Sequence, residues 1–133
     1  MRMKLELVPL PVADIERSLR FYTEQVGFTL DVDVDVAPAD GVRFVQLTPE
    51  GSSCSLSLSH GVPMLEKAPP GSARGIHLVV EDIEAAREEL IARGIEVSEI
   101  VHVGGGVRYA DFADPDGNSF LLQKMSWRTG SAF

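Results

Sequence analysis

Three histidines are the side chains of this sequence best suited to proton transfer or metal binding: His60, His77 and His102. A metal site of two imidazoles and a carboxylate would need at least two of them on adjacent strands at one depth. Strand alternation directs His77 toward an interior face, whereas His60 ends its strand and His102 lies at the far end of another. The spacing therefore does not favour a metal centre. His77 is a candidate general base, although a histidine without an acidic partner in the pattern is more often structural.

Other reactive residue types have ordinary structural interpretations. The single Cys54 cannot form an internal disulfide, and it lies in an apolar-alternating run where a cysteine is usually a small packed side chain. Asp31, Asp33 and Asp35 alternate with valines, which indicates a solvated strand face and not a calcium loop. Glycines 104–106 precede a strand-like run and lack a following Lys-Ser or Lys-Thr, which favours a hairpin over a phosphate loop. No Ser-His-Asp order or nucleophile elbow indicates hydrolysis.

The composition is that of an ordinary globular protein. The chain has 133 residues, 44% apolar and 24% charged, with 12 basic and 20 acidic side chains and a net charge of −8. This length predicts a single domain over residues 1–133. Because the basic residues are few and scattered, nucleic acid is not an expected partner. We find no secretory signal pattern and no apolar run of membrane-spanning length, so we expect a cytoplasmic protein without a membrane partner.

A repeat divides the chain into two halves. The segment Val12-Ala13-Asp14-Ile15-Glu16 returns as Val80-Glu81-Asp82-Ile83-Glu84, about half the chain later. Apolar residues at helical spacing follow each copy and predict helices at about 15–25 and 83–93, with the two aspartates as N-caps. Both helices should stop at a glycine, Gly27 and Gly94, where a left-handed C-terminal residue costs least.

Strand-like runs follow each helix, so both halves read βαβββ. Turn-forming residues separate these runs, and the Pro- and Gly-containing stretch between the two halves has no sustained pattern. We predict a first module at about 3–60, a linker at 61–74, a second module at 75–126 and a tail at 127–133. The strands after each helix are expected at about 28–36, 42–48 and 53–60, and at about 95–102, 107–113 and 119–125.

Two motifs carry a resemblance to a known family. Val12-x-Asp14-Ile15-x-x-Ser18-Leu19-x-Phe21-Tyr22, followed by Gly27-Phe28, resembles the opening strand and helix of a vicinal oxygen chelate module. Phe112-x-Asp114-Pro115-Asp116-Gly117-Asn118 resembles the turn before the last strand of that superfamily, which includes glyoxalases, bleomycin-resistance proteins and extradiol dioxygenases. The resemblance implies an α+β fold in which two βαβββ modules form a curled eight-stranded mixed sheet around a cleft, with the helices outside. It also implies a homodimer.

The same resemblance locates four metal-ligand positions of the superfamily. They fall on Leu7, Ser57, Gly75 and Leu121, with the alignment at Ser57 good to about two residues. Divalent metals need converging imidazole, carboxylate or thiolate donors, which leucine and glycine do not offer. We therefore expect no metal and no cofactor.

Strand alternation predicts which side chains would line the cleft. One side of the predicted strands carries Leu7, the serines at 55, 57 and 59, and every second residue from Ser119. The other side is more apolar and should form the core beneath the helices. The tail residue Trp127 and the linker residue Met64 are expected to close the cleft. The candidate ligand-binding residues are Leu7, Arg43 or Phe44 (whichever faces inward), Ser57, Ser59, His77, Tyr109, Leu121, Gln123 and Trp127.

The favoured hypothesis is a metal-free binding protein for a small hydrophobic or aromatic molecule, of the kind that confers drug resistance by sequestration. Two alternatives stay open. One is a glyoxalase-like lyase or isomerase, or a dioxygenase, although such chemistry depends on a Lewis-acid metal. The other is a metal-free enzyme in which His77 acts as general base.

Overall fold

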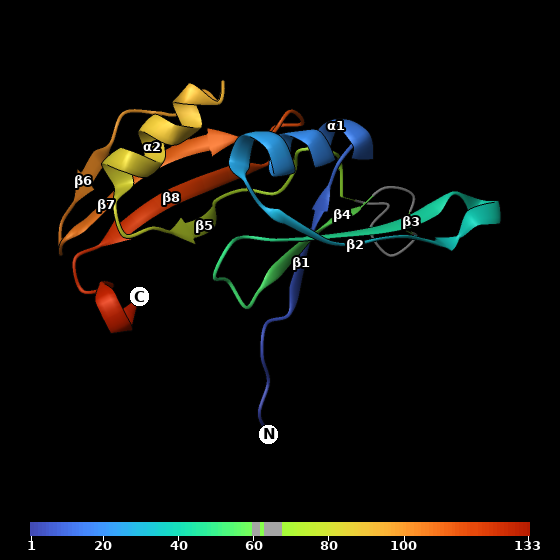
Figure 1. Cartoon of the computed structure of the whole chain (residues 1–133), viewed down its shortest axis with the longest axis horizontal. Helices are drawn as coiled ribbons and strands as arrows, with labels where there is room; N and C mark the ends of the chain where they lie inside the picture. The colour runs from blue at the N-terminus through green and yellow to red at the C-terminus, as the bar shows by residue number, and fades with distance from the viewer. Residues whose placement is uncertain (60–61, 63–67) are drawn as a thin grey trace. The chain divides into compact units, whose positions relative to one another are not determined.

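The computed structural model describes residues 1–59, 62 and 68–133. These residues form two compact units, which are described separately. The first unit contains residues 1–73 together with 114–118, and the second contains residues 74–113 and 119–133. Each unit has a four-stranded mixed sheet and one α-helix in its described part (Figure 1).

The first unit follows the order βαβββ. Its strands are β1 (Leu7–Pro11), β2 (Thr29–Ala37), β3 (Val42–Thr48) and β4 (Ser55–Ser59). The helix α1 (Ile15–Arg20) continues into a π-helical turn, η1 (Phe21–Val26), and a 3-10 turn, η2 (Pro38–Asp40), joins β2 to β3. The sheet order is β1-β4-β3-β2, with β1 and β4 parallel and the other pairs antiparallel, so β2 and β1 are the edge strands.

The second unit repeats this plan. Its strands are β5 (Ile76–Val79), β6 (Val101–Val103), β7 (Val107–Ala113) and β8 (Ser119–Met125), in the sheet order β5-β8-β7-β6. The helix α2 (Ile83–Ala92) lies over one face of β7 and β8, and a 3-10 turn, η4 (Gly130–Ala132), ends the chain (Figure 1). No helix in the described ranges is long and apolar enough to span a membrane.

These elements confirm the predicted α+β class and the two βαβββ modules. Hydrogen bonding divides the eight strands of the described chain into two sheets of four. The predicted helix starts are also confirmed, because Asp14 accepts from the backbone N–H of Arg17 at 3.1 Å and Asp82 accepts from Ala85 at 3.0 Å. Gly27 and Gly94 follow the helices with φ of 92° and 88°, as the stop signals predicted.

One predicted strand is largely wrong. Residues 95–102 were expected to be extended and paired, but only Val101–Val103 forms a strand. Ile95 instead turns into the core, and Ser98 is held by bonds outside a regular ladder. Its side chain accepts from the N–H of Asp111 at 2.9 Å, and its carbonyl accepts from Arg87 Nε at 2.7 Å. Together with one backbone bond from the Ser98 N–H to the Asp111 carbonyl at 3.0 Å, these bonds take the place of a regular strand ladder, and alternation in the sequence does not reveal them.

The core of the first unit lies between its sheet and the helix. Tyr22 is fully buried and lies between two rings, with centroid distances of 5.1 Å to Phe21 and 5.7 Å to Phe28. Such contacts add to the gain from burying each ring. The burial of Leu10, Val12, Leu56 and Leu58 follows the predicted parity, and Val45 and Leu47 of β3 are buried as well.

The core of the second unit has the same design. Phe112 of β7 and Phe120 of β8 are register partners, and their rings stack at 5.2 Å with an interplanar angle of 9°. The other buried apolar residues of this unit are Ile83, Leu90, Ile95, Ala110 and Leu122. On β8 the alternate side chains, including Leu121 and Gln123, are only half-buried, so one face of this sheet is committed to the core and the other is not.

Candidate functional site

The face of the second sheet that points away from α2 carries the most coherent group of candidate residues. Strand register places four of its side chains in one row across all four strands: Val79 of β5, Gln123 of β8, Tyr109 of β7 and Val101 of β6. Side chains at register partners lie about 5 Å apart, so an amide and a phenol ring are neighbours in the middle of this row. We call this surface the open face.

Two flanking rows extend the open face. The row on one side consists of the successive register partners His77, Leu121 and Asp111. The row on the other side consists of Val103, Val107 and Met125. Most of these side chains are apolar, and Val101 and Val103 are 42% and 47% exposed. An apolar surface with a few convergent polar groups is the usual makeup of a small-molecule site.

His77 lies at the margin of the open face and is exposed. Its Nδ1 is 2.7 Å from the carbonyl oxygen of Gly75, a contact in which the ring nitrogen acts as the donor because a carbonyl only accepts. This bond selects the tautomer whose Nε2 has a free lone pair. In the described part of the chain no carboxylate binds the His77 ring, and Leu121 separates it from Asp111 in the row.

The serines predicted to line a cleft lie on β4, whose side chains are buried on both faces. Ser57 and Ser59 both belong to this buried run, and Ser57 is the register partner of Pro9 and Gln46. Ser55 Oγ is 2.7 Å from Thr48 Oγ1 and accepts from Gln46 Nε2 at 3.3 Å. This set of bonds favours the interpretation that small hydroxyl side chains fill a narrow part of the sheet.

Arg43 and Phe44 were alternatives for one inward position, and the structure separates them. Arg43 lies on the α1 side, where its guanidinium pairs with Glu16 of α1 and, at 2.6 Å, with Asp33 of β2. The Arg43 hydrogen bonds hold the pKa of the Asp33 carboxyl below its usual range and raise the pKa of the guanidinium. Phe44 has the opposite parity and shares the side of Gln46 and Ser57. Of the two alternatives, this arrangement favours Phe44 as the inward-facing candidate.

Four further residues complete the set. Leu7 begins β1, is half-buried and pairs in register with Ser55. Trp127 follows β8 and is exposed. Met64, which was expected to help close the cleft, and His60 lie outside the described residues.

Comparison with known proteins decides the family. The model of the Glyoxalase/Bleomycin resistance protein/Dioxygenase superfamily matches residues 4–122. This chain belongs to that superfamily. Among solved structures it resembles TnmS3, an antibiotic binding protein from Streptomyces sp. CB03234, with 36% identity and a TM-score of 0.82, covering 94% of this chain and 98% of TnmS3.

The chain is also similar to two other proteins. A superfamily member from Sphaerobacter thermophilus is 28% identical with a TM-score of 0.78, covering 92% of this chain and 98% of the other. The uncharacterized protein YetH of Bacillus subtilis is 28% identical over 118 residues, which is 88% of this chain and 94% of YetH.

The residues at the metal-ligand positions of the superfamily do not fit a metal. In the second unit, the Gly75 N–H donates to Ser119 Oγ at 2.8 Å, and the aliphatic Leu121 lies between His77 and Asp111. In the first unit the positions hold Leu7 and Ser57, so a single hydroxyl is the only oxygen that the four side chains provide. The described residues contain no group of three or more His, Cys, Asp or Glu placed to hold a metal ion.

Sequence reasoning missed one buried polar cluster of the first unit. Tyr22 donates through its hydroxyl to Asp114 Oδ2 at 2.7 Å, and Asn118 Nδ2 donates to the same oxygen at 2.8 Å. Asn118 Nδ2 also donates to the Pro11 carbonyl at 3.0 Å, and Arg17 pairs with Asp116 at 2.8 Å. Burial, followed by the nearby Asp114 carboxyl, raises the pKa of the Tyr22 hydroxyl. Both partners belong to the superfamily motifs, but nothing in the local pattern pairs them.

Proposed function

We propose that this protein binds a small hydrophobic or aromatic molecule on the open face of the second sheet and acts by sequestering it. The observation that carries the proposal is the row of Val79, Gln123, Tyr109 and Val101, an apolar strip with one amide and one phenol at its centre. The 36% identity to TnmS3, an antibiotic binding protein, supports a role in binding a small molecule.

The chemistry of the row indicates how a flat ligand would be held. The Tyr109 ring offers a stacking surface, worth about 0.5–1.5 kcal/mol beyond the area that it buries. The Gln123 amide can both donate and accept, and a hydrogen bond of this kind contributes about 1 kcal/mol. The exposed valines supply the rest, at about 25 cal/mol for each Å² of apolar surface removed from water. Binding of this kind needs no metal and no activated group.

A metal-free reaction with His77 as general base is the second candidate. One observation favours it: the bond from Nδ1 to the Gly75 carbonyl leaves Nε2 able to accept a proton from a ligand on the adjacent row. Replacing His77 with Ala separates the two functions. If the variant binds as the wild type does but loses turnover, His77 acts as a base. If the variant binds more weakly and the wild type shows no turnover, His77 only lines the binding site.

We also infer that the protein works as a homodimer in the cytoplasm. Edge strands β2 and β6 support association, because each leaves one row of backbone groups without a partner strand in the described sheets. The single Cys54 agrees with a reducing compartment, since no internal disulfide is possible.

Calorimetric titration with a flat aromatic probe, anthraquinone-2-sulfonate, tests the binding proposal. We expect saturable binding to the wild type and a Kd at least tenfold higher for Tyr109→Ala, because stacking and apolar contact are lost together. Val101→Ala should weaken binding several-fold. Ile91→Ala is its matched control, since Ile91 of α2 is 43% exposed and Val101 is 42% exposed, but Ile91 lies on the helix. Equal effects of the two substitutions, or no effect of Tyr109→Ala, would place the probe elsewhere.

A further inference from the structure

Asp111 is the one side chain in the three rows of the open face that is charged when His77 is neutral. It is exposed, and among the described residues its carboxylate makes no hydrogen bond or ion pair. Ser98 holds its backbone, because the Asp111 N–H donates to Ser98 Oγ at 2.9 Å and the Asp111 carbonyl accepts from the Ser98 N–H at 3.0 Å. The strand thus fixes the position of Asp111 and leaves both carboxylate oxygens available to a ligand.

The basic side chains of β7 and β8 lie on the other side of this sheet. Arg108 and Lys124 are register partners, and each alternates along its strand with residues of the open face. Arg108 pairs with Glu84 of α2, and Lys124 Nζ donates to the Arg128 carbonyl at 3.2 Å. Along the described strands of this sheet, no lysine or arginine faces the same way as Asp111. An anionic ligand on the open face would therefore meet a negative charge without a positive one.

Asp111 and His77 are hydrogen-bond acceptors at the two ends of one row. They belong to β7 and β5, which lie on either side of β8, so the two side chains start about 10 Å apart. A carboxylate only accepts, and the bond from His77 Nδ1 to the Gly75 carbonyl leaves Nε2 as an acceptor too. Leu121 lies between them and is apolar. The ligand that best matches this row is apolar in its middle and carries hydrogen-bond donors at its ends.

We propose that the open face selects a flat aromatic ammonium. The fused-ring body of the ligand covers Leu121 and Tyr109, its protonated amine binds the Asp111 carboxylate, and a donor at its far end binds His77 Nε2. The inference rests on the proposed function, because it names the chemical class of ligand for the same face. Charge is then the property by which this site distinguishes aromatic molecules of similar shape.

The aromatic body of the ligand strengthens the pairing with Asp111. An ion pair on an open surface contributes little, because water screens both charges. A ring system on Leu121 and Tyr109 excludes water from one side of the carboxylate, where a hydrogen bond between two charged groups is stronger than one from a neutral donor. Tyr109 adds to the preference, because it lies two residues from Asp111 on the same face of β7, about 7 Å along the strand. A phenol ring attracts a cation over its face.

Calorimetric titration with three probes of one ring system tests the charge preference. The probes are 2-(aminomethyl)anthraquinone, which is an ammonium at neutral pH, the uncharged 2-(hydroxymethyl)anthraquinone, and anthraquinone-2-sulfonate. For the wild type we expect the ammonium to bind with a Kd about tenfold lower than the sulfonate, with the alcohol between them. Asp111→Asn should reduce the difference between the charged probes to about twofold or less, and Asp111→Lys should make the sulfonate the tighter ligand. Since the Asp111 side chain makes no bond within the described chain, neither change should alter the fold.

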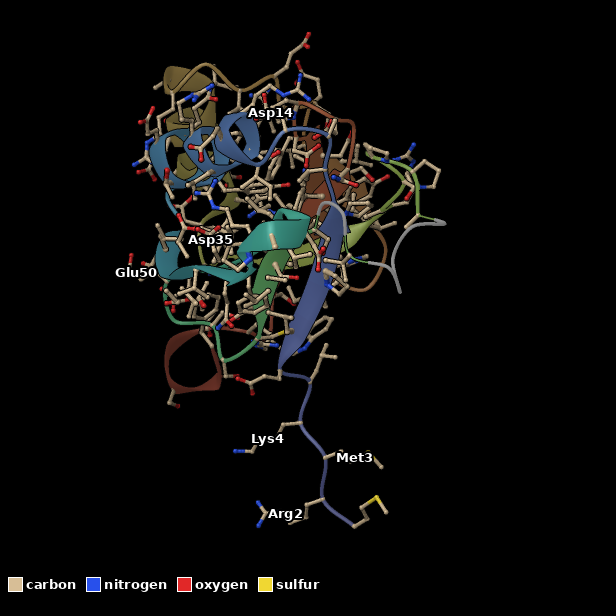
Figure 2. The ribbon with its side chains drawn as sticks, turned by 90° about the vertical axis from the view of Figure 1, so that its right-hand side faces the viewer. Arg2, Met3, Lys4, Asp14, Asp35 and Glu50 are labelled. Carbon is tan, nitrogen blue, oxygen red and sulfur yellow. The ribbon has the colours of Figure 1, made fainter. Side chains whose placement is uncertain are left out.

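Asp35 provides the matched control for net charge. It lies on β2 of the first unit (Figure 2), is exposed and, among the described residues, makes no side-chain hydrogen bond or ion pair. Asp35→Asn and Asp111→Asn each remove one negative charge from a protein of net charge −8. We expect Asp35→Asn to leave the preference for the ammonium within about twofold of the wild type, because its carboxylate is outside the open face. An equal loss in the two variants would show that the overall field of the protein selects the cation, and would overturn the role of Asp111.

The same titrations separate failure of this inference from failure of the proposed function. If both charged probes bind with similar Kd values and Tyr109→Ala weakens both, the open face binds aromatic molecules without selecting a cation, and this inference alone is overturned. If no probe binds, or if Tyr109→Ala changes nothing, the proposed function fails and this inference fails with it.

NMR of the wild-type complex locates the amine of the probe. With 2-(aminomethyl)anthraquinone at saturation, we expect nuclear Overhauser effects from its aminomethyl protons to the β protons of Asp111 and the ring protons of Tyr109. Effects to Lys124 instead would place the amine on the opposite side of the sheet and contradict the pairing.

Discussion

Tyr22 and Asp114 are 92 positions apart in the sequence, and yet the Tyr22 hydroxyl donates a buried 2.7 Å hydrogen bond to Asp114 Oδ2. Oδ1 of the same carboxyl accepts from the N–H groups of Asp116 and Asn118 at 3.0 and 2.9 Å. The turn at 114–118 is flanked by β7 and β8 of the second unit but belongs to the first. One carboxyl therefore both shapes this turn and ties it to the helical segment after β1.

Removing the Tyr22 hydroxyl should cost stability. We expect Tyr22→Phe to lower the free energy of unfolding by about 1–2 kcal/mol, because a buried donor to a carboxyl is lost. The loss is limited because Asn118 still donates to the same oxygen. Tyr109→Phe, the same change on the open face, should shift stability by less than about 0.5 kcal/mol. Urea unfolding of both variants provides the measurement. Equal losses would show that the Asp114 bond contributes nothing.

Two glycines with nearly the same backbone conformation should respond differently to alanine. Gly71 and Gly51 have φ of 80° and 81°. A Cβ at Gly71 would lie 1.9 Å from the carbonyl oxygen of Asp116, whereas a Cβ at Gly51 meets nothing within 4 Å. We expect Gly51→Ala to cost about 1 kcal/mol for the left-handed conformation alone, and Gly71→Ala to cost more than about 3 kcal/mol because backbone must move. Thermal unfolding that ranks the two variants equally would contradict this expectation.

The ion pair between Arg43 and Asp33 should be visible in a titration. Its hydrogen bonds lower the folded-state pKa of Asp33, so its contribution to stability is present above the ordinary carboxyl pKa and is lost as the pH falls through the lowered value. Arg43→Gln should raise the pKa of Asp33, measured by carboxyl-carbon NMR. The stability difference from the wild type should be larger at pH 7 than below about pH 3. Arg20→Gln, an exposed change on α1, should leave the Asp33 titration unchanged.

We expect no tightly bound metal, because of the side chains that occupy the four metal-ligand positions. Elemental analysis of the untagged wild type should find much less than one transition metal per chain, because Leu7, Gly75 and Leu121 offer no donor. Leu121→Glu would add a carboxylate between His77 and Asp111 in their shared row, and we expect this variant to gain weak, chelator-sensitive Zn²⁺ binding. Lys124→Glu, on the same strand, is the control. Leu122→Glu would not serve, because Leu122 lies in the core. Tightly bound metal in the wild type would defeat the argument.

Much of the fold could be predicted because its signals are local. Asp14 and Asp82 are followed by helical spacing, and each cap bond joins residues three apart, so the sequence alone contains both partners. Leu10 and Val12 are two residues apart and both buried, as are Phe120 and Leu122. This alternation of apolar residues is visible in the sequence itself.

Other features could not be predicted because they depend on partners far along the chain. Ser98 leaves the predicted strand through bonds to Arg87 and Asp111, and Arg43 turns outward toward Asp33 and Glu16. The pairing of β2 with β3 contains register shifts. Alternation along the sequence therefore did not decide whether Arg43 or Phe44 faces inward. The open face was found only in part, since the row of Tyr109 and Gln123 requires the pairing of β7 with β8.

The turn at 114–118 also has a consequence for synthesis of the protein. The ribosome releases β1 to β4 long before it incorporates Asp114, so Tyr22 leaves the exit tunnel without its acceptor. A nascent chain that stops before this turn would expose the Tyr22 hydroxyl, the Pro11 carbonyl and the N–H of Ala73, all of which bond to residues 114–118. We therefore expect the amino-terminal half to remain protease-sensitive on ribosomes stalled before residue 114, and to become protected only once residues 114–118 have left the exit tunnel.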